Sequence, residues 1–216
     1  MPFTEEERER VRRWAISQVE GVHLGDSSCL KLNRSEDPFT REEITILVDV
    51  IIEKDPEHQI TRIWLPERGL DDTCIEQLCR LTWLIELDVI FNRLTDQSIV
   101  FIAQSLSQLR SLLISGNTDI TNLKPLQTLT RLQSLVASDL PQLQMRDEDW
   151  SNLIQSTKLE FLSIEDSNGS KEARQTIRSE ILNAGREPKV ITDFLNDGLE
   201  DPETNDDVLL EEAKRV

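Results

Sequence analysis

The residue types that carry most enzyme chemistry are sparse in this sequence. It holds only two histidines, His23 and His58, which lie far apart along the chain, and three cysteines. A zinc site or a histidine-based catalytic triad needs several such groups together, and no closely spaced set of histidines and cysteines indicates either one. Cys74 and Cys79 lie among regularly spaced apolar residues, so we expect them to be buried thiols. The odd number of cysteines also favours a reducing compartment over a disulfide framework.

Other sequence patterns with known chemistry are also missing. The seven glycines are scattered singly, so the chain has no glycine-rich loop of the kind that binds phosphate. The acidic run at 147–149 lacks the glycine of a calcium-binding loop, and it is more typical of the start of a helix. We therefore expect no enzyme activity, no metal and no cofactor.

The composition narrows the range of partners. The 216 residues include 41 acidic and 24 basic side chains, which gives a net charge of −17. Such a charge disfavours nucleic acid and anionic lipid, because phosphate binding needs clustered lysine and arginine. No apolar run reaches the roughly 18 residues of a membrane helix, and the N-terminus lacks the apolar core of a signal peptide. These features predict a cytoplasmic monomer with no membrane insertion.

A short motif with the pattern L-x-x-L-x-L recurs along the chain. Its best copies begin at Leu84 and Leu109, and both have asparagine at the ninth position, Asn92 and Asn117. The fourth position of the six copies is held by Leu30, Ile63, Leu87, Leu112, Leu135 and Leu162. The steps between these positions are 33, 24, 25, 23 and 27 residues. All but the first fall within the range of roughly 20–29 residues that is typical of leucine-rich repeats.

Over about residues 27–168 the chain resembles the leucine-rich repeat family. The resemblance implies an α/β solenoid with a parallel concave sheet, helices on the convex side and helical caps at both ends. It also implies that Asn92 and Asn117 bond neighbouring backbone turns through their side-chain amides. In the copies at 30, 135 and 162, the ninth position is held by Ser35, Leu140 and Ser167. The turns of these copies are less well specified.

The spacers between the motifs predict helices. Segments that begin near Thr40, Asp71 and Asp96 place apolar residues at a helical period, as in repeats that resemble the ribonuclease-inhibitor class. In the first segment Thr40 and Glu43 form a capping box, and its apolar positions are 44, 47, 48, 51 and 52. Residues 122–130 contain a proline, so we expect a 3₁₀ or single-turn helix that resembles the short internalin-type repeat.

The two ends of the chain predict caps for the solenoid. Thr4 and Glu7 form a capping box before an amphipathic helix that we expect to end at Gly21. A closing helix is predicted over 170–184, with a last strand at 190–191. The predicted divisions are an N-terminal cap helix (1–24), about six repeats (25–168), a C-terminal cap helix with a short last element (169–195) and an acidic flexible tail (196–216).

The tail admits two interpretations. Like-charge blocks of this kind are usually solvated ends that aid solubility. Residues 208–216, VLLEEAKRV, also resemble the C-terminal signals of type IV secretion substrates of intracellular bacterial pathogens. That resemblance implies an effector that is delivered into the host cytoplasm.

The strands predict one face of the sheet as the binding surface. Because side chains alternate along a strand, the third and fifth motif positions should lie on the open, solvated face. The third position holds Cys29, Arg62, Glu86, Ser111, Ser134 and Phe161. The fifth position holds Lys31, Trp64, Asp88, Leu113, Val136 and Ser163. Trp64 beside Arg62 matches the composition of interface hot spots, unless the N-terminal segment covers it. The candidate partner-binding residues are Arg62, Trp64, Glu86, Asp88, Leu113, Val136 and Phe161.

The sequence therefore predicts a non-enzymatic module that binds another protein. One alternative is a regulator of a small GTPase, because Ran GTPase-activating proteins have helix-bearing repeats and act through loop residues. Arg68 and Arg93 occupy such loops here. The other alternative is an adaptor in the cytosol of its own cell.

Overall fold

The computed structural model describes residues 3–25, 28–32 and 38–168, together with 176–177, 179–180 and 189–191. Most of the predicted closing helix over 170–184 and the whole acidic tail lie outside the described residues. The described strand at 189–191 agrees with the predicted last strand.

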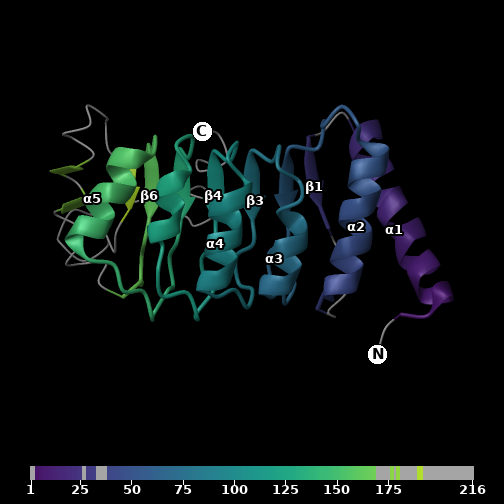
Figure 1. Ribbon diagram of the computed structural model, residues 1–216, viewed down its shortest axis with the longest axis horizontal. Coiled ribbons are helices and arrows are strands. Elements are labelled where there is room, and N and C mark those ends of the chain that lie inside the picture. Colours follow the sequence, from purple (N-terminus) through teal and green to yellow (C-terminus); the bar gives the residue numbers. More distant parts are fainter. Residues whose placement is uncertain are drawn as a thin grey trace, which may run out of the picture.

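The sheet contains seven described strands, all parallel and in chain order (Figure 1). They are β1 (Cys29–Lys31), β2 (Arg62–Trp64), β3 (Glu86–Asp88), β4 (Ser111–Leu113), β5 (Ser134–Val136), β6 (Phe161–Ser163) and β7 (Lys189–Ile191). Every predicted motif copy therefore forms a strand. The register also follows the prediction, because each fourth motif position pairs with the fourth position of the next copy.

The described helices line up along one face of this sheet (Figure 1). They are α1 (Glu5–Leu24), α2 (Arg41–Lys54), α3 (Asp72–Leu78), α4 (Asp96–Ser105), the 3₁₀ helix η1 (Lys124–Thr128) and α5 (Asp147–Ser156). The spacer containing Pro125 forms the predicted 3₁₀ helix, and the acidic run at 147–149 begins α5. The fold is an α/β solenoid, as the sequence predicted.

The main core lies between the sheet and the helices. The middle residue of each of the first six strands is at most 1% exposed: Leu30, Ile63, Leu87, Leu112, Leu135 and Leu162. From α2, Ile44, Leu47 and Ile51 pack into the same core. Ile52, expected on that buried stripe, is 41% exposed. One residue further along a helix turns the side chain by about 100°, away from the sheet.

Helix α1 begins as the sequence predicted and ends later. The backbone N–H of Glu7 donates to Thr4 Oγ1 at 3.2 Å, and the Thr4 N–H donates to the Glu7 carboxylate at 2.8 Å. The predicted end at Gly21 is wrong, because the helix continues to Leu24. Val22 is 8% exposed and belongs to the core. Its burial offsets the cost of about 1 kcal/mol of a glycine inside a helix.

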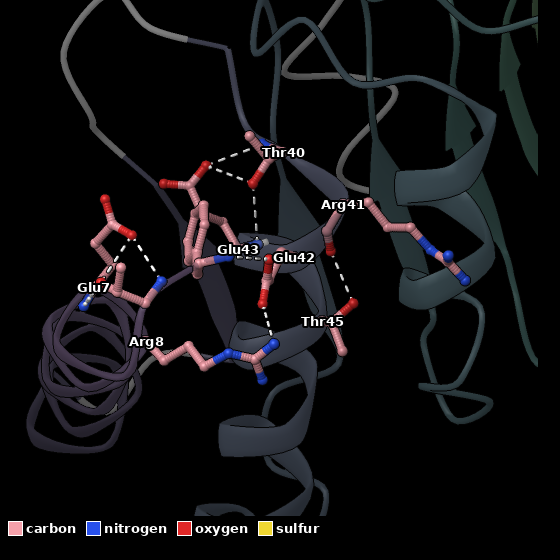
Figure 2. A network of polar contacts seen from close by, with 9 residues as sticks. Glu7, Arg8, Thr40, Arg41, Glu42, Glu43 and Thr45 are labelled. Carbon is pink, nitrogen blue, oxygen red and sulfur yellow. Dashed lines mark hydrogen bonds and ion pairs between the residues drawn. The ribbon is translucent and has the colours of Figure 1, made fainter. Parts of the chain in front are cut away.

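Helix α1 packs beside α2, and charged side chains border the contact. Figure 2 shows Arg8 of α1 pointing toward Glu42 of α2. The guanidinium and the carboxylate of this ion pair lie 2.5 Å apart. The Phe3 N–H donates to the other Glu42 oxygen at 3.1 Å. Because the Arg8 side chain is half exposed, the pair contributes little, roughly 0–1 kcal/mol. The buried side chains of Ala15, Val19 and Val22 are what α1 contributes to the main core.

The ninth motif position joins adjacent repeats, as the family resemblance implied. The Asn92 side chain accepts from the Leu70 N–H at 2.9 Å and donates to the carbonyls of Leu65 and Val89 at 3.0 and 2.9 Å. Leu65 and Leu70 belong to the preceding repeat, so one amide connects two loops. Asn117 repeats this arrangement one repeat later.

Serine takes the place of this asparagine after β6. Ser167 Oγ accepts from the Leu140 N–H at 3.1 Å and donates to the Ala137 carbonyl at 2.7 Å. A hydroxyl can make both bonds because it is a donor and an acceptor. The turn is therefore held in the same way, although the amide expected there is missing. Ser35, the corresponding residue of the first copy, lies outside the described residues.

Candidate functional site

The face of the sheet that points away from the helices is the candidate site, and we call it the second face. It is formed by the first and third residues of the strands β1 to β6, because their middle residues point into the main core. Leu113, Val136 and Phe161 form a hydrophobic cluster separate from that core, as side chains on the opposite face must. Both predicted rows are present in register, from Cys29 and Lys31 on β1 to Phe161 and Ser163 on β6.

The second face is less exposed than the sequence predicted. Eight of its side chains are at most 9% exposed: Glu86, Asp88, Ser111, Leu113, Ser134, Val136, Phe161 and Ser163. Residues paired in register stand side by side, and the apolar ones contact each other directly. The expectation of a solvated face is therefore wrong from β3 to β6. Arg62 and Trp64 are half-buried.

Trp64 is held between charged groups at the amino-terminal end of the second face. The Lys31 ammonium lies 3.4 Å from the centre of the Trp64 ring, in a cation–π contact. The indole N–H donates to the carboxylate of Glu86 on the next strand. Arg62 donates to Ser28 Oγ at 2.7 Å. Lys31 therefore covers part of the Trp64 ring, and Glu86 binds its indole nitrogen.

The other end of the second face is apolar. Leu113, Val136 and Phe161 come from three successive strands and are 0%, 9% and 2% exposed. Ile90, in the loop after β3, packs against them. The sequence predicted the first three as candidate residues, and the structure brings them together in one cluster.

Two serines between these ends have buried hydroxyl groups. Ser111 and Ser134 stand opposite one another on β4 and β5 and are 4% and 0% exposed. Neither hydroxyl has a hydrogen-bond partner among the described residues. A buried hydroxyl without a partner costs about 1–3 kcal/mol, so this pair is a local cost within the second face.

A cavity of about 250 Å³ opens beside the apolar cluster. Ile90, Val136 and Phe161 line its apolar part. Its other lining residues include Phe91 and three acids from the loops after β5 and β6: Asp139, Glu165 and Asp166. The sequence prediction missed Ile90, Phe91 and these acids. The available signal was an aromatic residue, Phe91, directly before Asn92 in a segment that otherwise follows the motif.

The residue at the eighth motif position, directly before the ninth, has an unusual backbone conformation in five repeats. Positive φ values occur at Glu67 (55°), Phe91 (51°), Gly116 (69°), Asp139 (53°) and Asp166 (50°). This conformation suits glycine and is tolerated by aspartate, but for a bulky residue such as phenylalanine it is an outlier. A Cβ atom at Gly116 would lie 2.2 Å from the Phe91 ring. Gly116 therefore permits both the turn and the position of that ring.

Among the described residues, the cysteines and His58 do not assemble into a reactive group. Cys74 and Cys79 are 1% and 5% exposed, which confirms the prediction of buried thiols. Burial raises the pKa of Cys74 to about 11 and that of Cys79 to about 12, which keeps both protonated near neutral pH. His58 stacks on Trp83 with 3.8 Å between ring centres. In the described part of the chain, no group of three His, Cys, Asp or Glu residues is placed to hold a metal ion.

The predicted loop arginines differ in environment. The backbone N–H of Arg68 donates to Asn92 Oδ1 at 3.0 Å, so this residue is part of the turn, and Arg93 is exposed one repeat later. Among the described helices, none has the length and apolar character needed to cross a membrane.

No protein-family model and no curated protein sequence matches the chain. Several solved structures are similar to it at low identity. They include an internalin of Listeria monocytogenes str. 4b F2365, with 21% identity and a TM-score of 0.49, over 70% of this chain and 42% of that one. Internalin C2 of the same strain has 17% identity and a TM-score of 0.43, over 73% and 83% of the two chains. TLR13, in a complex with ssRNA13, has 20% identity and a TM-score of 0.47, over 69% and 21%. The similar part thus spans less than half of the first internalin.

Proposed function

We propose that the protein is a non-enzymatic binding module whose partner, another protein, contacts the second face. The observation that supports this is the composition of that face. Six strands in register join a tryptophan between charges, an apolar cluster and a cavity into one surface. Aromatic anchors beside desolvated apolar residues are typical of protein interfaces. The half-buried Trp64 and the cavity are the parts that a partner would reach first.

Trp64→Ala is expected to weaken capture of the partner about 30-fold, because hot-spot truncations cost about 2 kcal/mol or more. Trp64→Phe also loses the hydrogen bond to Glu86 but keeps an aromatic ring over which Lys31 can lie. It is therefore expected to retain most of the binding. The measurement is quantitative mass spectrometry of proteins captured from cell lysate by each purified, folded variant.

Ile52→Ala is the matched control, because it removes an exposed apolar side chain from the helical face. It should capture the same proteins as the unmodified chain. If Trp64→Ala captures an unchanged set of proteins while remaining folded, the partner does not use this end of the second face.

The effector interpretation is a finer proposal about where the protein acts. It rests on residues 208–216, an acidic and apolar segment that ends in Lys214-Arg215-Val216 and lies outside the described residues. Fusion to a translocation reporter tests it. Deletion of residues 197–216 is expected to abolish delivery into host cells through a type IV secretion system. Undiminished delivery of the shortened fusion contradicts the secretion signal and leaves the binding proposal untouched.

A further inference from the structure

We infer that residues 208–216 of this chain cover the apolar cavity of the second face when no partner is bound. The occupant is a segment of the same molecule, and a partner must displace it. The docking itself does not depend on the proposed function, but the competition with a partner rests on it. The cavity volume of about 250 Å³ is below the range of roughly 300–1,000 Å³ of pockets that enclose drug-sized ligands, and it is the scale of one or two side chains.

The cavity presents apolar side chains that such an occupant can contact. Ile90 and Phe91 come from the loop after β3, and Val136 and Phe161 come from β5 and β6. Phe91 is 51% exposed, and among the described residues only Ile52 is another large apolar side chain that is exposed. An apolar segment that docks at the cavity removes the Phe91 ring from water, which favours the docked state.

The path of the chain brings the segment within reach of this cavity. β7 runs parallel to β6, so Ile191 lies at the same edge of the sheet as the loops after β5 and β6 that line the cavity. Neighbouring strands are about 4.8 Å apart, which puts the loop after β3 roughly 20 Å from β7. The sixteen residues 192–207 can extend to about 50 Å. They are therefore long enough to bring residues 208–216 to any part of the cavity.

The composition after β7 singles out residues 208–216 as the part that fits. All of 192–216 lies outside the described residues. Residues 192–207 contain seven acids and no base, and residues 1–191, with 32 acids and 22 bases, repel such a segment. Residues 208–216, VLLEEAKRV, contain two acids, two bases and five apolar residues. Their charges cancel, so they can place Leu209 or Leu210 at the cavity without net repulsion.

The connection within one molecule favours this occupant over a separate protein. A tethered segment meets the cavity at an effective concentration of the order of 1 mM, so a contact with a Kd of about 0.1 mM would be roughly nine-tenths formed. A second copy of the chain lacks this advantage and carries the same net charge of −17. Asp139, Glu165 and Asp166 beside the cavity already interact within the chain, so they are not left to select a base from a foreign partner.

Photo-crosslinking within the full chain tests the inference. Ala213 is replaced by p-benzoylphenylalanine, and mass spectrometry identifies the residues that it crosslinks on irradiation of the dilute protein. The expected crosslinks join residue 213 to residues 90–91, 136–139 or 161–166, which include most of the cavity lining. The same photoreactive residue in place of Leu199 should give roughly fivefold fewer crosslinks there, because the surrounding acids hold that part of the chain away.

Phe91→Asn should weaken the docking and leave the turn intact. Asparagine tolerates a positive φ, as the aspartates at the same motif position do, so only the exposed ring is lost. The crosslinks from residue 213 to the cavity should fall roughly fivefold, because less apolar surface is buried on docking. The double variant Leu209→Ala, Leu210→Ala should give a similar fall. Ile52→Ala, which removes an exposed apolar side chain from the helical face, is the matched control and should leave the yield unchanged.

Three results would overturn the inference. Crosslinks scattered over the whole surface would show that the segment has no preferred site. An unchanged yield in Phe91→Asn would show that the cavity is not what holds it. Crosslinks to the cavity that appear only between two molecules, as a covalent dimer, would assign the cavity to a second copy.

Capture of the partner separates this inference from the proposed function. Leu209→Ala, Leu210→Ala should raise Trp64-dependent capture up to about tenfold, because a face that is covered nine-tenths of the time is then free. Unchanged capture would contradict the competition with a partner. Cavity crosslinks without Trp64-dependent capture leave the docking intact and refute the proposed function. Trp64-dependent capture without cavity crosslinks refutes only the docking.

Discussion

Replacing Asn117 by alanine is expected to lower the free energy of unfolding by about 3–5 kcal/mol. The side chain is 0% exposed. Its oxygen accepts from the Leu94 N–H at 3.1 Å, and its amide donates to the carbonyls of Val89 and Ile114 at 3.0 and 2.7 Å. Alanine fills none of these roles, and each buried backbone group left without a partner costs about 1–3 kcal/mol. Urea denaturation measures the loss through the transition midpoint.

Asn117→Ser is the matched variant, because Ser167 already performs the corresponding role with one accepted and one donated bond. It should recover a substantial part of the stability that alanine loses. A loss below about 1 kcal/mol for Asn117→Ala would mean that water or a backbone shift satisfies these groups, and that the amide is not what joins the two loops.

Leu87→Ala is expected to cost about 2–5 kcal/mol, the range for truncating a fully buried leucine to alanine. Leu87 is the middle residue of β3 and is 0% exposed. It pairs with Ile63 on one side and Leu112 on the other, so the cavity that truncation leaves has large side chains on both sides. The loss appears in the same urea denaturation experiment, with an unchanged dependence on urea concentration if the fold is retained.

The exposed residue Ile52 provides the comparison for this truncation. Ile52→Ala removes a similar apolar side chain from a position that is 41% exposed, so its effect should be well below that of Leu87→Ala. Similar losses at both positions would falsify the assignment of Leu87 to a tightly packed layer.

The spacing of leucines was sufficient to predict the sheet. Ile63 and Leu112 lie in the core in the expected register because only one register turns every fourth motif residue toward the helices. Pro125 and the acidic run at 147–149 predicted their helices through local effects: a missing backbone donor and a favourable charge at a helix N-terminus. These effects depend only on residues that are adjacent in the chain, so they can be recognised from the sequence.

The accessibility of the second face could not be predicted in the same way. Alternation tells which side of the sheet Ser134 and Leu113 occupy, but their exposure depends on residues from other repeats. The cavity has the same origin, because Phe91 and Asp139 come from loops 48 positions apart in the sequence. The end of α1 was missed for a related reason. A contact of Val22 with the core outweighs the local preference of Gly21.

The sequential order of the strands also shapes how the molecule responds to stress. Each strand from β1 to β6 pairs only with its neighbours in the chain, so the repeats behave as a row of coupled units. A change that destabilises one repeat also destabilises the adjacent repeats, and local unfolding can begin at either end and spread inward. A partner that reaches from Trp64 on β2 to Phe161 on β6 would link units that strand pairing leaves unconnected. Binding of such a partner would make the unfolding of these repeats more cooperative, so that they unfold together and not one after another.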